Sequence, residues 1–175
     1  MKTREGGKTA LIIILALMAA GLIWYAVAST PPFSTPASTP PIGEIEYSNI
    51  LLYFHNPSKD PRADICSRDA VFPVVRRVPK TQTPVQDAVQ LLLKGELTAE
   101  ERMAGFSTEF PLKGLELAGA NLKDGVLTLE FRNPENRTGG GSCRVGILWS
   151  QIEKTAMQFS GVKQVRFIPE ELFQP

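Results

Sequence analysis

The sequence predicts an α+β domain in which two main helices pack on one face of a small, mostly antiparallel sheet. Two amphipathic helical patterns, within residues 83–95 and 142–161, each need an apolar surface to cover. Several half-buried strand patterns supply that surface, and two of them meet at an Asp-Gly turn. These patterns fall within residues 44–175, which leaves room for one domain with its own core.

The first two strands are expected on either side of a polar loop. Ser48 to His55 is a β-rich apolar run, and Val71 to Val78 is a second strand candidate. Pro73 has no backbone N–H, so this second strand is expected at an edge of the sheet or at a bulge. Residues 57–69 predict the loop, which carries Cys66.

The next two elements are helices whose ends are marked by cap residues. Thr83-Pro84-Val85-Gln86 predicts a capping box with proline at the first helical position, and Gly95 predicts a left-handed C-cap. Thr98 and Glu101 predict a second capping box, which opens a short helix that ends near Gly105. The first helix has one apolar face, formed by Val85, Ala88, Val89 and Leu92.

The C-terminal half is expected to contain a hairpin, a long helix and a last strand. Asp124-Gly125 predicts a two-residue turn between a strand with Leu115, Leu117 and Leu122 and a strand with Leu127, Leu129 and Phe131. Ser142 is expected to cap the long helix, and Gly161 to end it. The apolar positions of this helix are Val145, Leu148, Trp149, Ile152, Ala156 and Phe159. The last strand is short and contains Val162, Val165, Phe167 and Ile168.

The N-terminal 43 residues predict a membrane anchor and a spacer. Residues 1–8 carry three cations and are expected to stay in the cytoplasm. Residues 9–28 form an uncharged apolar run that, as a helix, matches the hydrocarbon thickness of a bilayer. Residues 29–43 are rich in Pro, Ser and Thr and predict a semi-extended linker. The domain is therefore expected outside the cytoplasmic membrane, as the C-terminal part of a single-pass protein.

A cleaved signal peptide is the alternative to a retained anchor. Ala26-Val27-Ala28 followed by Ser29 fits the small-x-small cleavage pattern. Against cleavage, the apolar run is longer than the roughly 7–15 residues of a typical signal, and Trp24-Tyr25 crowds the site. Both interpretations place the domain outside the cytoplasm.

Cys66 and Cys143 are the two cysteines of the chain, and they predict a disulfide. Both lie in the exported part, where disulfides persist, and no third cysteine competes for pairing. Cys143 begins the second long helix, and Cys66 lies just before the second strand. Two separate buried thiols are the alternative.

The sequence predicts no catalytic residues, no metal and no cofactor. His55 is the single histidine, so a Ser–His or Cys–His dyad would have to use it, and a lone histidine at a strand end is more often a surface residue. Metal sites need several His, Cys or carboxylate ligands at ordered spacing. The net charge of +1, from 19 basic and 18 acidic residues, gives no electrostatic case for nucleic acid.

Residues from about 50 to 175 resemble the GerMN domain, the sporulation and spore-germination domain of bacteria. The resemblance rests on an ordered set of segments: TPVQDAVQLLLKGELTAEERMAGFSTEFP, then LKDGVLTLEF, then GGGSCRVGILWSQIEKTAMQFSGVKQVRFI. Leu51, Tyr53 and Phe54 in the first strand and VFPVVRRV in the second also match. This chain departs from the family pattern at one turn, where Gly95 is followed by Glu96-Leu97-Thr98 in place of Pro-Thr.

The resemblance implies a compact domain similar to the ring-building motifs of envelope assemblies. It also implies a non-catalytic role in a protein held at the membrane, and it offers no catalytic residues to carry over. The first hypothesis is therefore a membrane-tethered interaction or assembly module of the cell envelope. It would bind itself or other envelope proteins through the strand with Pro73, another exposed edge or a helix face.

Two other classes of function remain as hypotheses. One is a stalk-presented binding domain for cell-wall glycan or a small solute. The other is an envelope hydrolase that uses His55.

Overall fold

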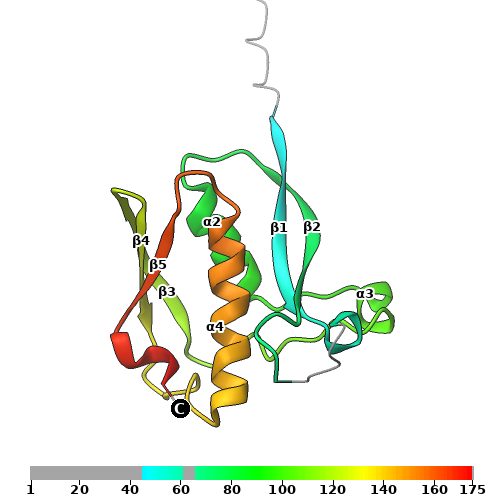
Figure 1. Cartoon of the computed structure of the whole chain (residues 1–175). Helices are drawn as coiled ribbons and strands as arrows, with labels where there is room; N and C mark the ends of the chain where they lie inside the picture. Colours follow the sequence, from blue (N-terminus) through cyan, green and yellow to red (C-terminus); the bar gives the residue numbers. More distant parts are fainter. Residues whose placement is uncertain (1–44, 61–65, 175) are drawn as a thin grey trace, which may run out of the picture. The chain divides into compact units, whose positions relative to one another are not determined.

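The two N-terminal strands form an antiparallel ribbon in the structure, a computed structural model that describes residues 45–60 and 66–174 (Figure 1). Strand β1 (Tyr47–His55) pairs with β2 (Val71–Pro79) along its whole length, from Tyr47↔Pro79 to His55↔Val71. Both predicted strands are confirmed, and Pro73 lies at an edge because each strand of this ribbon has only one strand neighbour. A short 3-10 turn, η1 (Pro57–Lys59), follows β1.

The predicted cytoplasmic segment 1–8, transmembrane helix 9–28 and linker 29–43 lie outside the described residues. Within the two described ranges, no helix has the length and apolar character needed to span a bilayer.

The predicted helices form, and their caps agree with the sequence in part. Helix α2 spans Pro84–Leu93, with Pro84 in its first turn. Gly95 follows it with a φ of +65°, as expected of a left-handed C-cap. The predicted capping box at Thr83 is wrong: the Thr83 hydroxyl donates to Asp87 Oδ1 at 3.4 Å and makes no bond to the first-turn amides.

Helix α3 (Ala99–Met103) has the predicted capping box, with both reciprocal hydrogen bonds. Thr98 Oγ1 accepts from the Glu101 amide at 3.2 Å, and Glu101 Oε2 accepts from the Thr98 amide at 2.9 Å. Helix α4 (Ser142–Met157) begins one residue earlier than predicted, because Gly141 is its N-cap and Ser142 is already helical.

The remaining strands form a three-stranded sheet in the order β3–β4–β5. Strands β3 (Glu116–Lys123) and β4 (Val126–Arg132) are antiparallel, and β5 (Gln164–Ile168) runs parallel to β4. Asp124 and Gly125 have φ values of 53° and 84°, so the predicted two-residue hairpin turn is confirmed, with both residues in the left-handed region. A final 3-10 turn, η2 (Glu170–Phe173), was not expected from the sequence.

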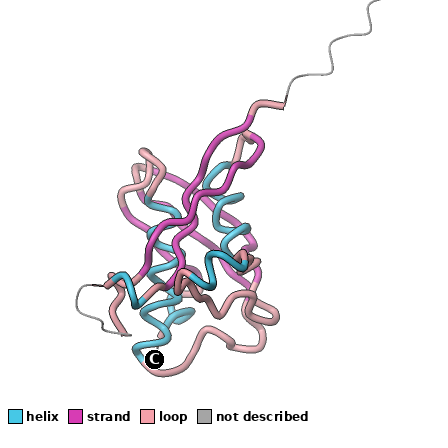
Figure 2. The backbone as a smooth tube through the Cα atoms, turned by 90° about the vertical axis from the view of Figure 1, so that its right-hand side faces the viewer, coloured by secondary structure: helices cyan, strands magenta, loops and turns pink. Residues whose placement is uncertain are grey.

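The α+β class is confirmed, with two main helices and two small, mostly antiparallel sheets in place of the single sheet expected. Figure 1 shows α2 and α4 between the β1–β2 ribbon and the β3–β4–β5 sheet, and in Figure 2 the ribbon lies in front of the helices. The core is formed by the inner sides of both sheets together with one face of each helix, and its fully buried members include Leu52, Phe54, Val89, Leu92, Leu127, Leu129, Leu148 and Ile152.

The division into two sheets has a physical cause at the second edge of β1. Gln158, just after α4, bonds both backbone groups of Leu51: its Oε1 accepts from the Leu51 amide at 2.7 Å, and its Nε2 donates to the Leu51 carbonyl at 2.6 Å. Thr155 Oγ1 accepts from the Tyr53 amide at 3.0 Å. Side chains at the end of α4 therefore make the hydrogen bonds that a further strand would otherwise make.

Candidate interaction surface

Cys66 and Cys143 form the predicted disulfide. Their Cα atoms lie 4.8 Å apart, which is within the usual range for a bridge. Cys143 is in the first turn of α4, so the bridge joins the segment before β2 to the start of the longest helix. Ser150, two turns further along α4, holds the same segment by donating to the Arg68 carbonyl at 2.9 Å.

His55 lies at the end of β1 beside Ser107. The Ser107 amide donates to the His55 carbonyl at 2.8 Å, and Ser107 Oγ is 3.4 Å from His55 Nδ1. This separation is long for a hydroxyl and an imidazole that act as nucleophile and base. The surface has a small hollow at the start of α2 and an open space between α4 and β5, and neither His55 nor Ser107 lines them. The pair joins β1 to the segment that follows α3.

Potential metal ligands are scattered over the described part of the chain. There, no cluster of three or more His, Cys, Asp or Glu side chains is placed to hold a metal ion.

The side of the β1–β2 ribbon that faces away from the core is mostly apolar. Because side chains alternate along a strand, the residues between the buried ones form this side, and we call it the outer ribbon face. Its members are Tyr47, Asn49, Leu51, Tyr53, Pro73, Val75, Arg77 and Pro79. Val75 is 58% exposed and Tyr47 is 45% exposed. The outward side of an antiparallel sheet is usually polar, so an apolar outward side of this size is unusual.

The outer ribbon face carries a single formal charge. Arg77 provides it, and its guanidinium carbon lies 4.6 Å from the centre of the Tyr47 ring. The stem and head of Arg77 therefore extend the aromatic surface rather than interrupt it. The central part of protein interfaces has a similar composition, with few charged residues and many aromatic residues and arginines.

Both edges of the ribbon are interrupted, so neither offers a continuous row of free backbone groups to a further strand. The β1 edge is bonded by Thr155 and Gln158. The backbone N–H and C=O groups of Leu51 and Tyr53 therefore point away from β2. In an antiparallel pair, residues opposite each other point their backbone groups the same way relative to the partner strand, so those of Val75 and Pro73 point away from β1, to the free edge of β2. By the same alternation Pro79 also faces that edge, and neither proline has an N–H to donate. An incoming strand could not form a continuous ladder there.

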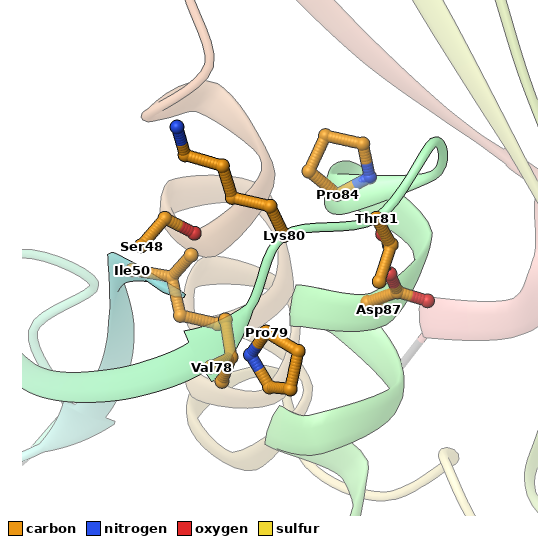
Figure 3. A pocket seen from close by; sticks show the side chains of 8 residues that line it. All are labelled: Ser48, Ile50, Val78, Pro79, Lys80, Thr81, Pro84 and Asp87. Atoms are coloured by element: carbon orange, nitrogen blue, oxygen red, sulfur yellow. Dashed lines mark hydrogen bonds between the residues drawn. The ribbon is translucent and has the colours of Figure 1, made fainter. Parts of the chain in front are cut away.

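A small hollow lies where the open end of the ribbon meets the start of α2 (Figure 3). Its volume is about 240 Å³, which is below the usual range for pockets that bind small molecules. Figure 3 shows Thr81 and Asp87 facing each other, and these side chains are hydrogen bonded. Lys80 forms an ion pair with Glu46. Three of the hollow's polar groups are thus engaged within the protein, and much of the remaining wall is apolar, from Ile50, Val78, Pro79 and Pro84.

A bidentate ion pair fixes α3 to the ribbon. Arg76 Nη1 and Nη2 donate to the two carboxylate oxygens of Glu101 at 2.6 and 2.8 Å, and Nη2 also donates to the Glu96 carbonyl at 3.0 Å. The hydrogen bonds from Arg76, together with the Thr98 amide, hold the pKa of the Glu101 carboxyl below its usual value. Glu101 therefore links the capping box of α3 to β2.

Replacing Glu101 with glutamine is expected to lower the free energy of unfolding by about 1–2 kcal/mol, because a charge-assisted bidentate pair is lost. A carboxyl whose pKa is lowered by folding stabilises the protein above its unfolded-state pKa, and this contribution is lost as the pH falls through the folded-state value. The difference between the wild type and Glu101→Gln should therefore shrink as the pH falls below 4.5, the usual value for glutamate.

Denaturant unfolding of the full chain in neutral detergent, at neutral and acidic pH, measures this difference. Glu100→Gln is the matched control, since Glu100 is in the same helical turn and the ion pair to Arg76 is made by Glu101. The pKa of Glu100 is also lowered, by its backbone hydrogen bond and by the Thr98 side chain, so equal effects of the two variants would show that the ion pair adds nothing beyond such local hydrogen bonds.

One of the comparisons with known proteins identifies a family. The family model described as Germane, sporulation and spore germination, matches residues 51–170. No curated protein matches the chain. Three solved chains match. One is the first GerMN domain of the sporulation protein GerM from Bacillus subtilis, with 17% identity over 69% of this chain and 80% of that chain and a TM-score of 0.50.

A second solved structure contains the tandem GerMN domains of the same Bacillus subtilis protein. It shares 18% identity over 73% of this chain, with a TM-score of 0.46, and the present chain spans 41% of its length. At such identities, the likeness to the single domain shows a shared fold.

Proposed function

This chain belongs to the GerMN family of sporulation and spore-germination domains, and from this membership we propose that it is a non-catalytic assembly module of the cell envelope. In this proposal residues 9–28 hold the chain in the cytoplasmic membrane, and the domain outside it binds a second copy or another envelope protein. The family is linked to sporulation and germination and is not known as a family of enzymes.

The observation that carries the proposal is the outer ribbon face. Val75 and Tyr47 are exposed on a surface with one formal charge, next to the half-buried Leu51 and Tyr53. Prolines on one edge and α4 side chains on the other favour contact through this face over pairing at the strand with Pro73. A membrane tether would concentrate copies in a plane, so a weak contact could still drive assembly.

The glycan- or solute-binding alternative has less support. The hollow beside the ribbon is small, and several of its polar side chains are already paired within the protein. A solute site needs polar groups that remain available to orient the ligand.

Replacing Val75 with glutamate is expected to weaken association at least tenfold, because it places a charge in the middle of an apolar contact. The measurement is photo-crosslinking in intact cells that express the full chain, with the photoreactive group at Tyr47. Adducts should form with the wild type and be lost in the Val75→Glu background.

Thr128→Glu is the matched control, because Thr128 lies on β4 in the other sheet and its side chain faces away from the buried Leu127 and Leu129. It should leave the adducts unchanged. Adducts that persist in Val75→Glu, or that disappear equally in Thr128→Glu, would contradict a role for the outer ribbon face.

A further inference from the structure

A second surface feature lies on the side of α4 away from the β1–β2 ribbon, where the helix runs beside β5 (Figure 1). An open space of about 350 Å³ lies between them, and we call it the β5–α4 groove. The residues that matter for its chemistry are Trp149, Glu153, Val165, Phe167, Glu170 and Phe173. None of these belongs to the outer ribbon face, so a ligand of the groove would be independent of the proposed function.

One wall of the groove is an open sheet edge. β5 is the last strand of its sheet, and in the described part of the chain no strand pairs with its far side. The Gln164 amide donates to the Gly125 carbonyl at 3.1 Å, which sets the alternation of the parallel ladder with β4. Val165 and Phe167 therefore direct their N–H and C=O groups away from β4. Both residues line the groove.

The floor of the groove is aromatic. The Trp149 and Phe167 rings meet edge to face with centroids 5.1 Å apart, and Phe167 and Phe173 do so at 4.9 Å. Trp149 is half-buried, and the guanidinium carbon of Arg68 lies 5.9 Å from the centre of its ring, so the remainder of the indole is available for contact. Interlocked rings form a rigid floor, which costs little ordering when a ligand binds.

The charges around the groove differ between its two sides. Glu153 lies one helical turn after Trp149 on α4, and Glu170 lies at the start of η2. Arg166 also borders the groove, but it alternates with the buried Val165 and Phe167 and so faces the outer side of the sheet. The side toward α4 therefore combines two carboxylates with aromatic rings, and Arg68 beside Trp149 is a cation close to it.

We propose that the β5–α4 groove binds an extended peptide segment with basic side chains, which adds as a fourth strand beside β5. The backbone of the segment would bond to the N–H and C=O groups of Val165 and Phe167. Alternate side chains of an extended peptide point to one side, so its lysines or arginines would lie between Glu153 and Glu170. An edge strand beside a helix is a recurrent way to bind peptides, with the backbone giving affinity and the pocket giving specificity.

The test uses the full chain in neutral detergent and a fluorescein-labelled peptide of about nine residues in which valine and lysine alternate. Fluorescence anisotropy at low salt should show saturable binding. A peptide with glutamate in place of lysine should bind at least tenfold more weakly. A lysine peptide that is N-methylated on alternate residues cannot pair with β5 and should also bind at least tenfold more weakly.

Glu153→Lys should reverse the preference between the lysine and glutamate peptides. Glu130→Lys is the matched control, because Glu130 is exposed on β4, outside the groove, and it should leave the preference unchanged. Absence of saturable binding, equal binding of the N-methylated peptide, or equal effects of the two substitutions would each overturn the proposal. The outcome with Glu130→Lys separates binding in the groove from general attraction to an acidic surface.

Discussion

Replacing both Cys66 and Cys143 with serine is expected to lower the free energy of unfolding by about 4 kcal/mol. The bridge closes a loop of 77 positions, for which the chain-entropy relation gives about 4.5 kcal/mol at 25 °C. Most of this loss comes from the unfolded state, which gains conformational entropy and so becomes more favourable when the link is removed. The bridge also restrains the segment before β2 against the first turn of α4, and non-covalent contacts such as the Ser150–Arg68 hydrogen bond and the Lys154–Asp69 ion pair would then have to hold that segment.

Urea unfolding of the full chain in neutral detergent measures the effect. Reduction of the wild type with dithiothreitol should lower the midpoint as the double variant does, because both remove the same covalent link. A double variant within about 1 kcal/mol of the oxidised wild type would show that the loop is already restricted in the unfolded chain.

Replacing Gly95 with alanine is expected to cost about 3 kcal/mol or more, which is the second large effect. Gly95 follows α2 with a φ of +65°, a region that L-residues with a side chain rarely occupy. An added Cβ would lie 1.8 Å from the Phe110 carbonyl oxygen, so the backbone of that segment would have to move. Phe110 belongs to the core, and the movement would disturb its packing.

Gly114→Ala separates these two causes. Gly114 also has a left-handed φ, of +76°, but its nearest heavy atom would be 3.7 Å away, at ordinary contact distance. This variant should lose only the conformational part, about 1 kcal/mol. Thermal unfolding of both variants beside the wild type provides the comparison, and equal losses would show that the close approach to Phe110 is relieved without cost.

The order of the main elements could be predicted from the sequence because local signals marked them. The Asp-Gly turn, the Thr98–Glu101 capping box and the glycine after α2 depend on residues close to one another in the chain, and all three are confirmed. The apolar face of α4 is confirmed by the burial of Val145, Leu148, Ile152 and Ala156. The disulfide followed from the count of cysteines.

The division into two sheets could not be predicted, because it depends on contacts between distant residues. Thr155 and Gln158 lie more than a hundred positions from the strand they bond. The sequence did contain one signal of such contacts. Gln151 and Thr155 are polar, but they lie in α4 next to its buried apolar residues, and both are fully buried. Polar side chains on an inward face need partners, but the sequence does not say which.

The apolar character of the outer ribbon face was equally hard to recognise in the sequence. Alternation predicts that one side of β1 faces the core, and an apolar residue on the other side, such as Leu51, obscures that alternation. The capping box expected at Thr83 failed for a related reason. The Asp87 carboxylate one turn later takes hydroxyl bonds from both Thr81 and Thr83, a competition that the four-residue motif does not contain.

The bonds from Thr155 and Gln158 to β1 make the edge of a sheet depend on a helix from the other end of the domain. The same helix packs against β5 and α2, so both halves of the fold meet on it. A chain that has formed the ribbon but not α4 still exposes a pairing-competent edge, and it closes that edge only after the last third of the sequence has folded. Protection of the β1 edge from pairing with other chains therefore comes late in folding.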